Sequence, residues 1–370
     1  MPQLVISIDA MGGDHGPAVV APAVARAVKH GLDARFLLHG DERVLKSAFA
    51  KLPGLEGRLE IRHTDKAIGS DDKPALAMRR GKGSSMWNAV EAVKSGEAGA
   101  CVSAGNTGAL MAIALLILRM LADMERPALV ASWPTPKGDT AVLDVGANIS
   151  ADARRLVEFA ILGAAFHHAV HGSIRPTVGL LNVGSEDQKG HEEVREAHRM
   201  LREMSGLELD YRGFVEGDDI PMGTVDVVVT DAFTGNVALK TGEGLARYFR
   251  ASLRAALTSS PLARLGALIA SAALRRMADQ LRPEFDGGPF LGLNGIVVKS
   301  HGGADARGFA TAIRLAADLA ASDFVARIDR NLRTMTAAMP NEAAPAAQPE
   351  AAAGDAAPGS SSGVGERTKA

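Results

Sequence analysis

Three loops of the sequence combine glycine with hydroxyl, amide and charged residues in patterns suited to binding an anion. The stretch "IDAMGGDHGP" (residues 8–17) places two adjacent glycines between two aspartates, with a histidine beside the second. "SAGNTGA" (103–109) and "KSHGGAD" (299–305) have a similar character. Glycine lets a backbone approach a ligand closely, and free N–H groups at a helix start attract negative charge. These loops therefore predict an anion site.

Three further loops have the same setting: "DVGANIS" (144–150), "NVGSEDQKG" (182–190) and "TDAFTGN" (230–236). All six follow a short apolar run and precede a helical pattern. The apolar runs are residues 4–8, 100–102, 141–143, 177–181, 225–229 and 296–299. Six strand–loop–helix units predict an α/β fold, with a mostly parallel sheet sandwiched by helices. Ligands of such sheets bind beyond the carboxyl ends of the strands, so we expect all six loops to line one crevice.

The composition narrows the classes of function. The chain has 41 basic and 43 acidic residues and a formal net charge of −2, which argues against general nucleic-acid binding. Its single cysteine, Cys101, excludes an internal disulfide and lies in an apolar run typical of a core strand. Nucleotide-binding fingerprints and a serine nucleophile elbow are absent from the sequence. His167 and His171 share a helix face, but no carboxylate completes a metal set. We expect no metal and no cofactor.

The organisation of the chain is simple apart from two segments. We expect one catalytic domain over residues 1–335 and, because residues 336–370 are rich in Ala, Pro, Gly and Ser, a disordered tail. A helical tip is expected at 258–283, where arginines flank an apolar run at 267–274. That tip fits a core helix with solvated arginines, a membrane-surface helix or a docking surface for an acidic carrier protein.

Taken in order, the motifs "IDAMGGDHGP", "SAGNTGALM", "DVGAN", "NVGSEDQKG", "TDAFTGN" and "LGLNGIVVKSHGGAD" resemble those of the bacterial phosphate acyltransferases of phospholipid synthesis, the PlsX family. The resemblance covers about residues 4–330. It implies a fold similar to isocitrate and isopropylmalate dehydrogenases and related to the phosphotransacetylases. The implied reaction is attack of inorganic phosphate on a long-chain acyl thioester of acyl carrier protein. A membrane glycerol-phosphate acyltransferase would consume the acyl phosphate.

The resemblance also implies a cytoplasmic homodimer that associates peripherally with the inner face of the cell membrane. Its tip would contact membrane or carrier through Leu262, Arg264, Leu265, Ile269, Arg275 and Arg276. Two rival functions stay open: a short-chain phosphotransacetylase that uses coenzyme A, and a non-enzymatic scaffold that binds carrier or membrane. A nicotinamide-dependent dehydrogenase is disfavoured because the dinucleotide fingerprint is missing.

The implied reaction assigns expected roles to the loop residues. The backbone of six residues would cradle phosphate or the thioester carbonyl: Gly12, Gly13, Gly105, Asn106, Thr107 and Gly108. Lys189 and Lys299 would offset negative charge, and His15 or His301 would protonate the departing sulfur or orient phosphate. Three strand-end aspartates, Asp9, Asp144 and Asp231, would fix loop N–H groups. The other expected binding residues are Asp14, Ser103, Asn148, Asn182, Ser185 and Asn236.

Overall fold

The computed structural model describes residues 3–72, 74–121, 124–281 and 285–338. The chain up to Ala338 forms one compact unit. Helix α13 (Phe324–Ala338) ends that unit, so the first three residues of the predicted tail are helical. The rest of the predicted tail, residues 339–370, lies outside the described residues.

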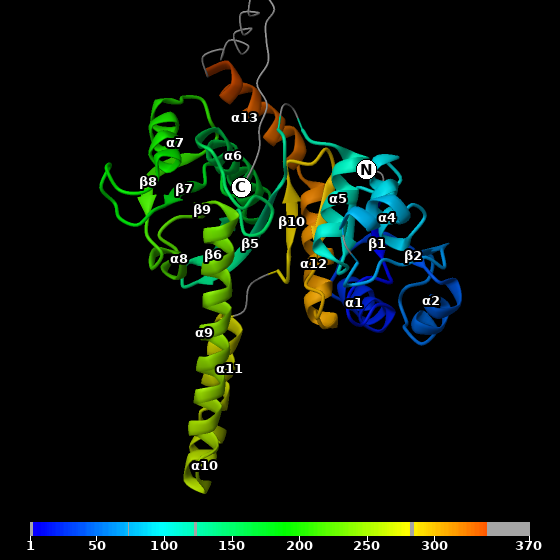
Figure 1. Cartoon of the computed structure of the whole chain (residues 1–370). Coiled ribbons are helices and arrows are strands. Elements are labelled where there is room, and N and C mark those ends of the chain that lie inside the picture. The colour runs from blue at the N-terminus through cyan, green and yellow to red at the C-terminus, as the bar shows by residue number, and fades with distance from the viewer. Residues whose placement is uncertain (1–2, 73, 122–123, 282–284, 339–370) are drawn as a thin grey trace, which may run out of the picture. The chain divides into compact units, whose positions relative to one another are not determined.

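The described residues contain one sheet of eleven strands, in the order β3-β2-β1-β4-β11-β10-β5-β6-β9-β7-β8 (Figure 1). All six predicted strand–loop–helix units are present. Of the other five strands, β10 and β5 lie at the centre of the sheet, and β2, β3 and β8 lie towards its two ends. The strands are β1 (Leu4–Asp9), β2 (Ala34–Gly40), β3 (Leu59–His63), β4 (Ala100–Ser103), β5 (Ala128–Thr135), β6 (Gly138–Leu143), β7 (Thr177–Leu181), β8 (Asp210–Val215), β9 (Val227–Val229), β10 (Gly288–Leu291) and β11 (Ile296–Lys299).

Strand direction reverses across the centre of the sheet. Strands β1, β2, β3, β4 and β11 pair in parallel, and so do β6, β9, β7 and β8. Between the two groups, the β11–β10, β10–β5 and β5–β6 pairings are all antiparallel. Three reversals make β6 run opposite to β11. The predicted single crevice is therefore wrong: the carboxyl ends of the two parallel groups face opposite edges of the sheet.

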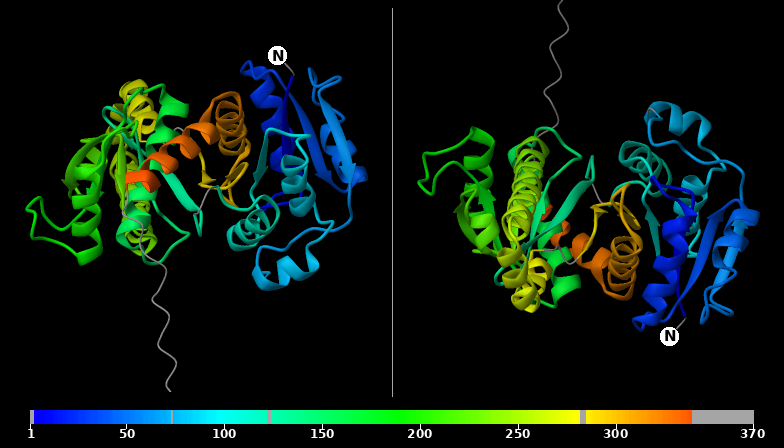
Figure 2. Two further views of the ribbon diagram at one scale, coloured as in Figure 1. Left: turned by 90° about the horizontal axis from the view of Figure 1, so that it is seen from above. Right: turned by 90° about the horizontal axis from the view of Figure 1, so that it is seen from below.

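Helices cover both faces of the sheet, as Figure 2 shows. In the first parallel group, α12 packs on β1, β4 and β11 and also against α1, while α4 packs on β1, β2 and β4. In the second group, α6 packs on β6, β7 and β9, and α9 contacts β6. The helices are α1 (Pro17–Lys29), α2 (Glu42–Phe49), α3 (Pro74–Arg80), α4 (Ser85–Lys94), α5 (Thr107–Leu118), α6 (Ala153–His171), α7 (Glu192–Glu203), α8 (Asp219–Met222), α9 (Ala232–Thr258), α10 (Pro261–Ile269), α11 (Ser271–Gln280), α12 (Ala306–Ala321) and α13.

The core of the first group explains its apolar strands and the apolar helix α5. Leu110, Ile113 and Leu118 of α5 are fully buried and pack in one cluster with Cys101 of β4 and Val297 of β11. Burial raises the pKa of the Cys101 thiol well above its usual range, so the cysteine is held as an unreactive thiol. Cys101 is a core residue, as predicted.

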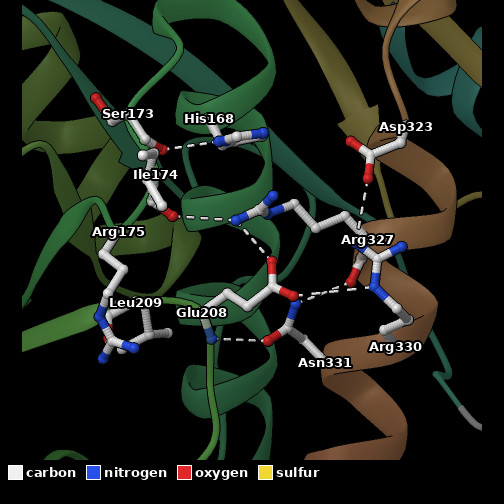
Figure 3. Close-up of polar contacts among 10 residues, drawn as sticks. All are labelled: His168, Ser173, Ile174, Arg175, Glu208, Leu209, Asp323, Arg327, Arg330 and Asn331. Atoms are coloured by element: carbon white, nitrogen blue, oxygen red, sulfur yellow. Dashed lines mark hydrogen bonds and ion pairs between the residues drawn. The ribbon is translucent and has the colours of Figure 1, made fainter.

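Helix α13 is fixed to the second group by a polar network (Figure 3). Arg327 donates to the Ile174 carbonyl oxygen at 3.0 Å and pairs with Glu208 at 2.6 Å. Asn331 accepts from the Glu208 backbone N–H at 2.9 Å and donates to the Arg327 carbonyl oxygen at 2.9 Å. Because Arg327 and Asn331 are buried, these bonds satisfy polar groups that would otherwise be costly to bury.

Helix α9 starts at the sheet beside β6 and extends away from it, and α10 and α11 lie along its far part (Figure 1). No residue of α10 or α11 is buried, so the core-helix interpretation of this segment is wrong. Leu262 and Ile269 of α10 are 78% and 79% exposed. The three helices also enclose an apolar groove of about 530 Å³ that includes Leu253, Leu268 and Leu274 in its lining. None of the described helices combines the length and apolar composition needed to cross a bilayer.

The buried imidazole of His39 in β2 predicts an acid-sensitive fold. Its Nε2 lies 3.0 Å from Ser7 Oγ, and burial lowers its pKa from 6.5 to about 4. The unfolded chain therefore binds more protons between these two values, and stability falls as pH falls through this window. When the pH has fallen to about 4, we expect the protonation of His39 to have lowered the free energy of unfolding by about 3 kcal/mol.

Urea denaturation at a series of pH values measures this effect. The variant His39→Gln keeps a polar side chain but cannot take up the proton, so its stability should depend less steeply on pH over the same window. Equal slopes for the two proteins would contradict the prediction.

Candidate functional site

The first three predicted loops meet at the carboxyl ends of β1, β4 and β11. The Asp14 backbone N–H donates to the Gly302 carbonyl oxygen at 2.9 Å, which joins the first loop to the third. A methyl group on Gly12 would lie only 2.5 Å from Asp9 Oδ2 and 2.8 Å from the Gly105 nitrogen. Glycine is thus required where the first loop passes the second. We call residues 9–16, 103–108 and 299–305 the strand-end site.

Ser103 connects the strand-end carboxylate to the second loop. Its hydroxyl donates to Asp9 Oδ2 at 2.7 Å and accepts from the Gly105 backbone N–H at 3.0 Å. Both side chains are fully or almost fully buried. A buried chain of this kind fixes the direction of the Gly105 peptide, and with it the entry into helix α5.

The N-terminus of α5 has no acidic cap, a feature that it shares with α1 and α7 among the helices that follow predicted loops. Its cap is neutral Asn106, whereas α6, α9 and α12 are capped by Asp152, Asp231 and Asp305. Asn106 Oδ1 accepts only from the Ala109 N–H at 2.9 Å. The N–H groups of Thr107 and Gly108 have no acceptor among the described residues. A positive helix end with free donors and no acidic cap favours an anion.

Lys299 places a buried amine beside this helix end. The side chain is 8% exposed. Its Nζ donates to the Ala104 carbonyl oxygen at 3.3 Å and to the Ser300 carbonyl oxygen. It makes no ion pair with a carboxylate in the described part of the chain. Burial lowers its pKa from 10.5 to about 8, while the charges of Asp286, Asp14 and Asp9 act in the opposite direction.

Two of the carboxyl groups near Lys299, those of Asp9 and Asp286, have shifted pKa values. Burial raises the pKa of Asp9, against the effect of the Ser85 and Ser103 hydroxyls and two backbone N–H groups. Burial also raises the pKa of Asp286, against the charges of His301 and Lys299. For both carboxyl groups, burial disfavours the charged form.

Asp286 and Ser85, which lie outside the three predicted loops, also belong to this neighbourhood. Asp286 precedes a Gly-Gly pair, and Ser85 follows the glycine-rich "GKG" stretch. Glycines beside a polar residue are the same pattern that marks the predicted loops, so both residues could have been found from the sequence. Ser300 is fully buried, and its hydroxyl has no hydrogen-bond partner among the described residues.

The two predicted histidines of this site lie on its exposed side. His301 Nδ1 accepts from the Gly303 backbone N–H at 3.1 Å, so this nitrogen carries no proton in that arrangement. His15 and Asp14 are both exposed, and His15 makes no side-chain hydrogen bond within the described residues. Both rings are open to solvent, in contrast to the buried amine of Lys299.

The fourth predicted loop, after β6, is closed by its own aspartate. Asp144 accepts from four backbone N–H groups, those of Leu129, Gly146, Ala147 and Asn148, at 2.7–3.1 Å. It also accepts from Asn148 Nδ2 at 2.6 Å. These donors are already bonded, which leaves them unavailable to an outside anion. Asp144 and Asn148 therefore shape this edge of the sheet.

The loops after β9 and β7 lie at the same edge as Asp144. Asp231 caps α9 by accepting from the Thr234 N–H at 2.8 Å, and Asn236 Nδ2 donates to the Val145 carbonyl oxygen at 3.0 Å. Asn182 Nδ2 donates to the Lys189 carbonyl oxygen at 3.1 Å, which closes the 182–190 loop on itself. In that loop, Lys189 and Ser185 are exposed. No hydrogen bond or ion pair between described residues joins this edge to the strand-end site.

A metal site is not apparent in the described ranges, which hold no group of three or more His, Cys, Asp or Glu side chains placed to bind an ion. The rings of His167 and His171 are 4.4 Å apart, and His167 Nε2 lies 3.8 Å from Asp226 Oδ1.

Solved structures define the class of fold. EutD phosphotransacetylase from Staphylococcus aureus matches with a TM-score of 0.57 at 17% identity, covering 86% of this chain and 94% of that chain. A branched-chain phosphotransacylase from Enterococcus faecalis V583 matches with a TM-score of 0.54 at 16% identity, covering 86% and 99%. A 4-hydroxythreonine-4-phosphate dehydrogenase from Burkholderia phymatum has a TM-score of 0.50 at 18% identity, covering 86% and 99%. The chain thus has the predicted α/β fold of phosphotransacetylases and related dehydrogenases.

Sequence comparison identifies the family within this fold. The profile of a family described as "Fatty acid synthesis protein" matches residues 4–327. The phosphate acyltransferase of Caulobacter vibrioides is 70% identical over 335 residues, which cover 90% of this chain and 93% of the relative. That of Phenylobacterium zucineum is 62% identical over 336 residues, covering 91% and 95%. The chain belongs to this PlsX family of phosphate acyltransferases and is an enzyme of the acyltransferase class.

Proposed function

We propose that this acyltransferase moves a long-chain acyl group from acyl carrier protein to inorganic phosphate, giving acyl phosphate and the free carrier thiol. The observation that carries the proposal is the strand-end site, where free N–H groups of α5, a neutral cap and the buried Lys299 amine converge. The names of the relatives support phosphate as acyl acceptor. The resemblance of the six loops supports the acyl carrier as donor.

In this reaction the protein has to bind and orient the two reactants but need not supply a nucleophile. Phosphate is already an anionic oxygen nucleophile, so no serine or cysteine need attack first. The Thr107 and Gly108 N–H groups would hold the phosphate or the oxyanion formed on the thioester carbonyl. Holding nucleophile and thioester in line can lower the barrier by about 7–11 kcal/mol. The residues before α5, fixed by Asp9 and Ser103, would supply that orientation.

An assay of thiol release with purified protein tests the function. Palmitoyl-acyl carrier protein with inorganic phosphate should release free thiol and form acyl phosphate, and omission of phosphate should abolish both. Acetyl-coenzyme A should be a poor donor. Preferential use of acetyl-coenzyme A would support the short-chain phosphotransacetylase instead. Binding of the carrier without thiol release would support the non-enzymatic scaffold.

We also propose that α10 and α11 bring the enzyme to the inner surface of the cell membrane, where a glycerol-phosphate acyltransferase would consume the product. Leu262, Leu265 and Ile269 are exposed on α10. Arg264 of α10 and Arg275 and Arg276 of α11 are also exposed and suit anionic headgroups. The resemblance of the six loops supports a homodimer, and the apolar groove along α9–α11 is a surface that a second copy would cover.

The double substitution Leu265→Glu with Ile269→Glu should weaken binding to phosphatidylglycerol vesicles by about 100-fold, because two apolar side chains no longer enter the lipid. Cosedimentation with vesicles measures the change. A matched control replaces two exposed apolar residues elsewhere, Val44→Glu with Leu116→Glu, which are 45% and 55% exposed. Vesicle binding that persists in the α10 variant while turnover of acyl carrier falls would assign these residues to carrier docking.

A further inference from the structure

The amine of Lys299 is placed differently from the two histidines that the sequence suggests as proton donors. It is buried, while His15 and His301 are exposed. Its two acceptors, the carbonyl oxygens of Ala104 and Ser300, hold it beside the loop that enters α5. An ammonium group has three N–H bonds, and the third has no acceptor among the described residues. The described residues therefore leave one N–H of Lys299 available to a ligand.

We propose that Lys299 is the general acid that protonates the departing sulfur of the thioester. This inference rests on the proposed function and assigns one step of it. The carbonyl contacts hold the ammonium at the loop that leads into α5, where the thioester would meet the bound phosphate. The two histidines differ from Lys299 in burial, because both rings are exposed and no described residue fixes the His15 side chain.

The step balances without any further reactant. An oxygen of hydrogen phosphate forms a bond to the acyl carbon, the carbon–sulfur bond breaks, and sulfur takes a proton from Lys299 Nζ. The acyl phosphate retains the proton that came with hydrogen phosphate and passes it to the neutral amine. The lysine is thereby restored, and the products are acyl phosphate and a free thiol.

The charges around Lys299 suit this exchange. Burial lowers its pKa to about 8, near the value of about 8.5 of an ordinary thiol. Three carboxyl groups from neighbouring segments face it and act against that decrease: Asp286 before β10, Asp14 in the first loop and Asp9 at the end of β1. An acid whose pKa lies close to that of the leaving group and to the working pH transfers its proton efficiently.

The variant Lys299→Arg keeps the positive charge but cannot release a proton near neutral pH. With palmitoyl-acyl carrier protein, we expect kcat to fall by about 100-fold or more. With palmitoyl-thionitrobenzoate, whose thiolate leaves without a proton, the variant should retain most of the wild-type rate. Lys137→Arg, an exchange on an exposed loop, is the matched control. Thermal melting of each variant verifies folding.

A pH profile tests the same step in the natural reaction. The wild-type kcat with palmitoyl-acyl carrier protein should fall as pH rises through about 8, because the amine loses its proton. The residual activity of Lys299→Arg should lack this decrease. Equal losses on both thioesters, or the same decrease in the variant, would overturn the assignment to Lys299. A wild-type enzyme that forms no acyl phosphate at all would instead contradict the proposed function.

Discussion

Replacing Gly12 with alanine should lower the rate of acyl phosphate formation by about 100-fold or more, because a small displacement of positioning groups has effects of this size. The added methyl group would lie 2.5 Å from Asp9 Oδ2 and 2.8 Å from the Gly105 nitrogen. One of these groups must move. Both belong to the chain of bonds through Ser103 that sets the entry into α5. The free N–H groups of Thr107 and Gly108 would then lose their alignment with phosphate.

Steady-state kinetics with varied phosphate measures this loss. The matched control is Gly217→Ala, since a methyl group there would meet nothing within 4 Å. The control should keep wild-type kinetics, and both variants should melt as folded proteins. A Gly12→Ala enzyme with unchanged kcat and unchanged phosphate dependence would show that this close approach does not shape the site.

Replacing Asp144 with alanine should destabilise the fold by about 3–5 kcal/mol, because several N–H groups would lose their acceptor at once. The carboxylate is fully buried and bonds four backbone N–H groups and the Asn148 side chain. A side chain on Gly235 of α9 would also clash with the Asp144 carbonyl oxygen, so the loop has little room to rearrange.

Urea denaturation compares this variant with Asp33→Ala. Asp33 is 78% exposed and pairs with Arg58 at 2.7 Å, so its loss should change stability by less than about 1 kcal/mol. Equal stability of the two variants would mean that water replaces the Asp144 carboxylate at little cost.

The sequence allowed the six strand–loop–helix units to be predicted because each is a local pattern. An apolar run such as residues 177–181 of β7 and the periodic helix after it are visible within about thirty residues. The self-contained Asp144 loop is local as well, since most of its bonds join residues two to four positions apart.

The arrangement of the loops could not be predicted in the same way. Strand direction across the sheet depends on β10, which has four residues and pairs Phe290 with Leu129 of β5. That contact joins distant parts of the chain, so no local sequence pattern predicts it. The contact of Lys299 Nζ with the Ala104 carbonyl oxygen spans 195 positions. The sequence therefore predicts which loops carry polar residues, but it does not predict that these loops are divided between opposite edges of the sheet.

The segment 261–280 shows a different limit. Its apolar stripe could cover a core or face outward, and only the tertiary structure shows that α10 and α11 bury none of their residues. Periodicity predicts which side chains share a face of a helix. What packs against that face depends on the rest of the fold.

The central claim is that main-chain N–H groups at the start of α5, beside Lys299, hold the attacking phosphate. A crystal structure of the enzyme soaked in inorganic phosphate, at a concentration that saturates turnover, tests this most directly. We expect the ion within hydrogen-bonding distance of the Thr107 and Gly108 nitrogens. Phosphate bound only at the opposite edge of the sheet, beside Lys189 or Asp231, would contradict it.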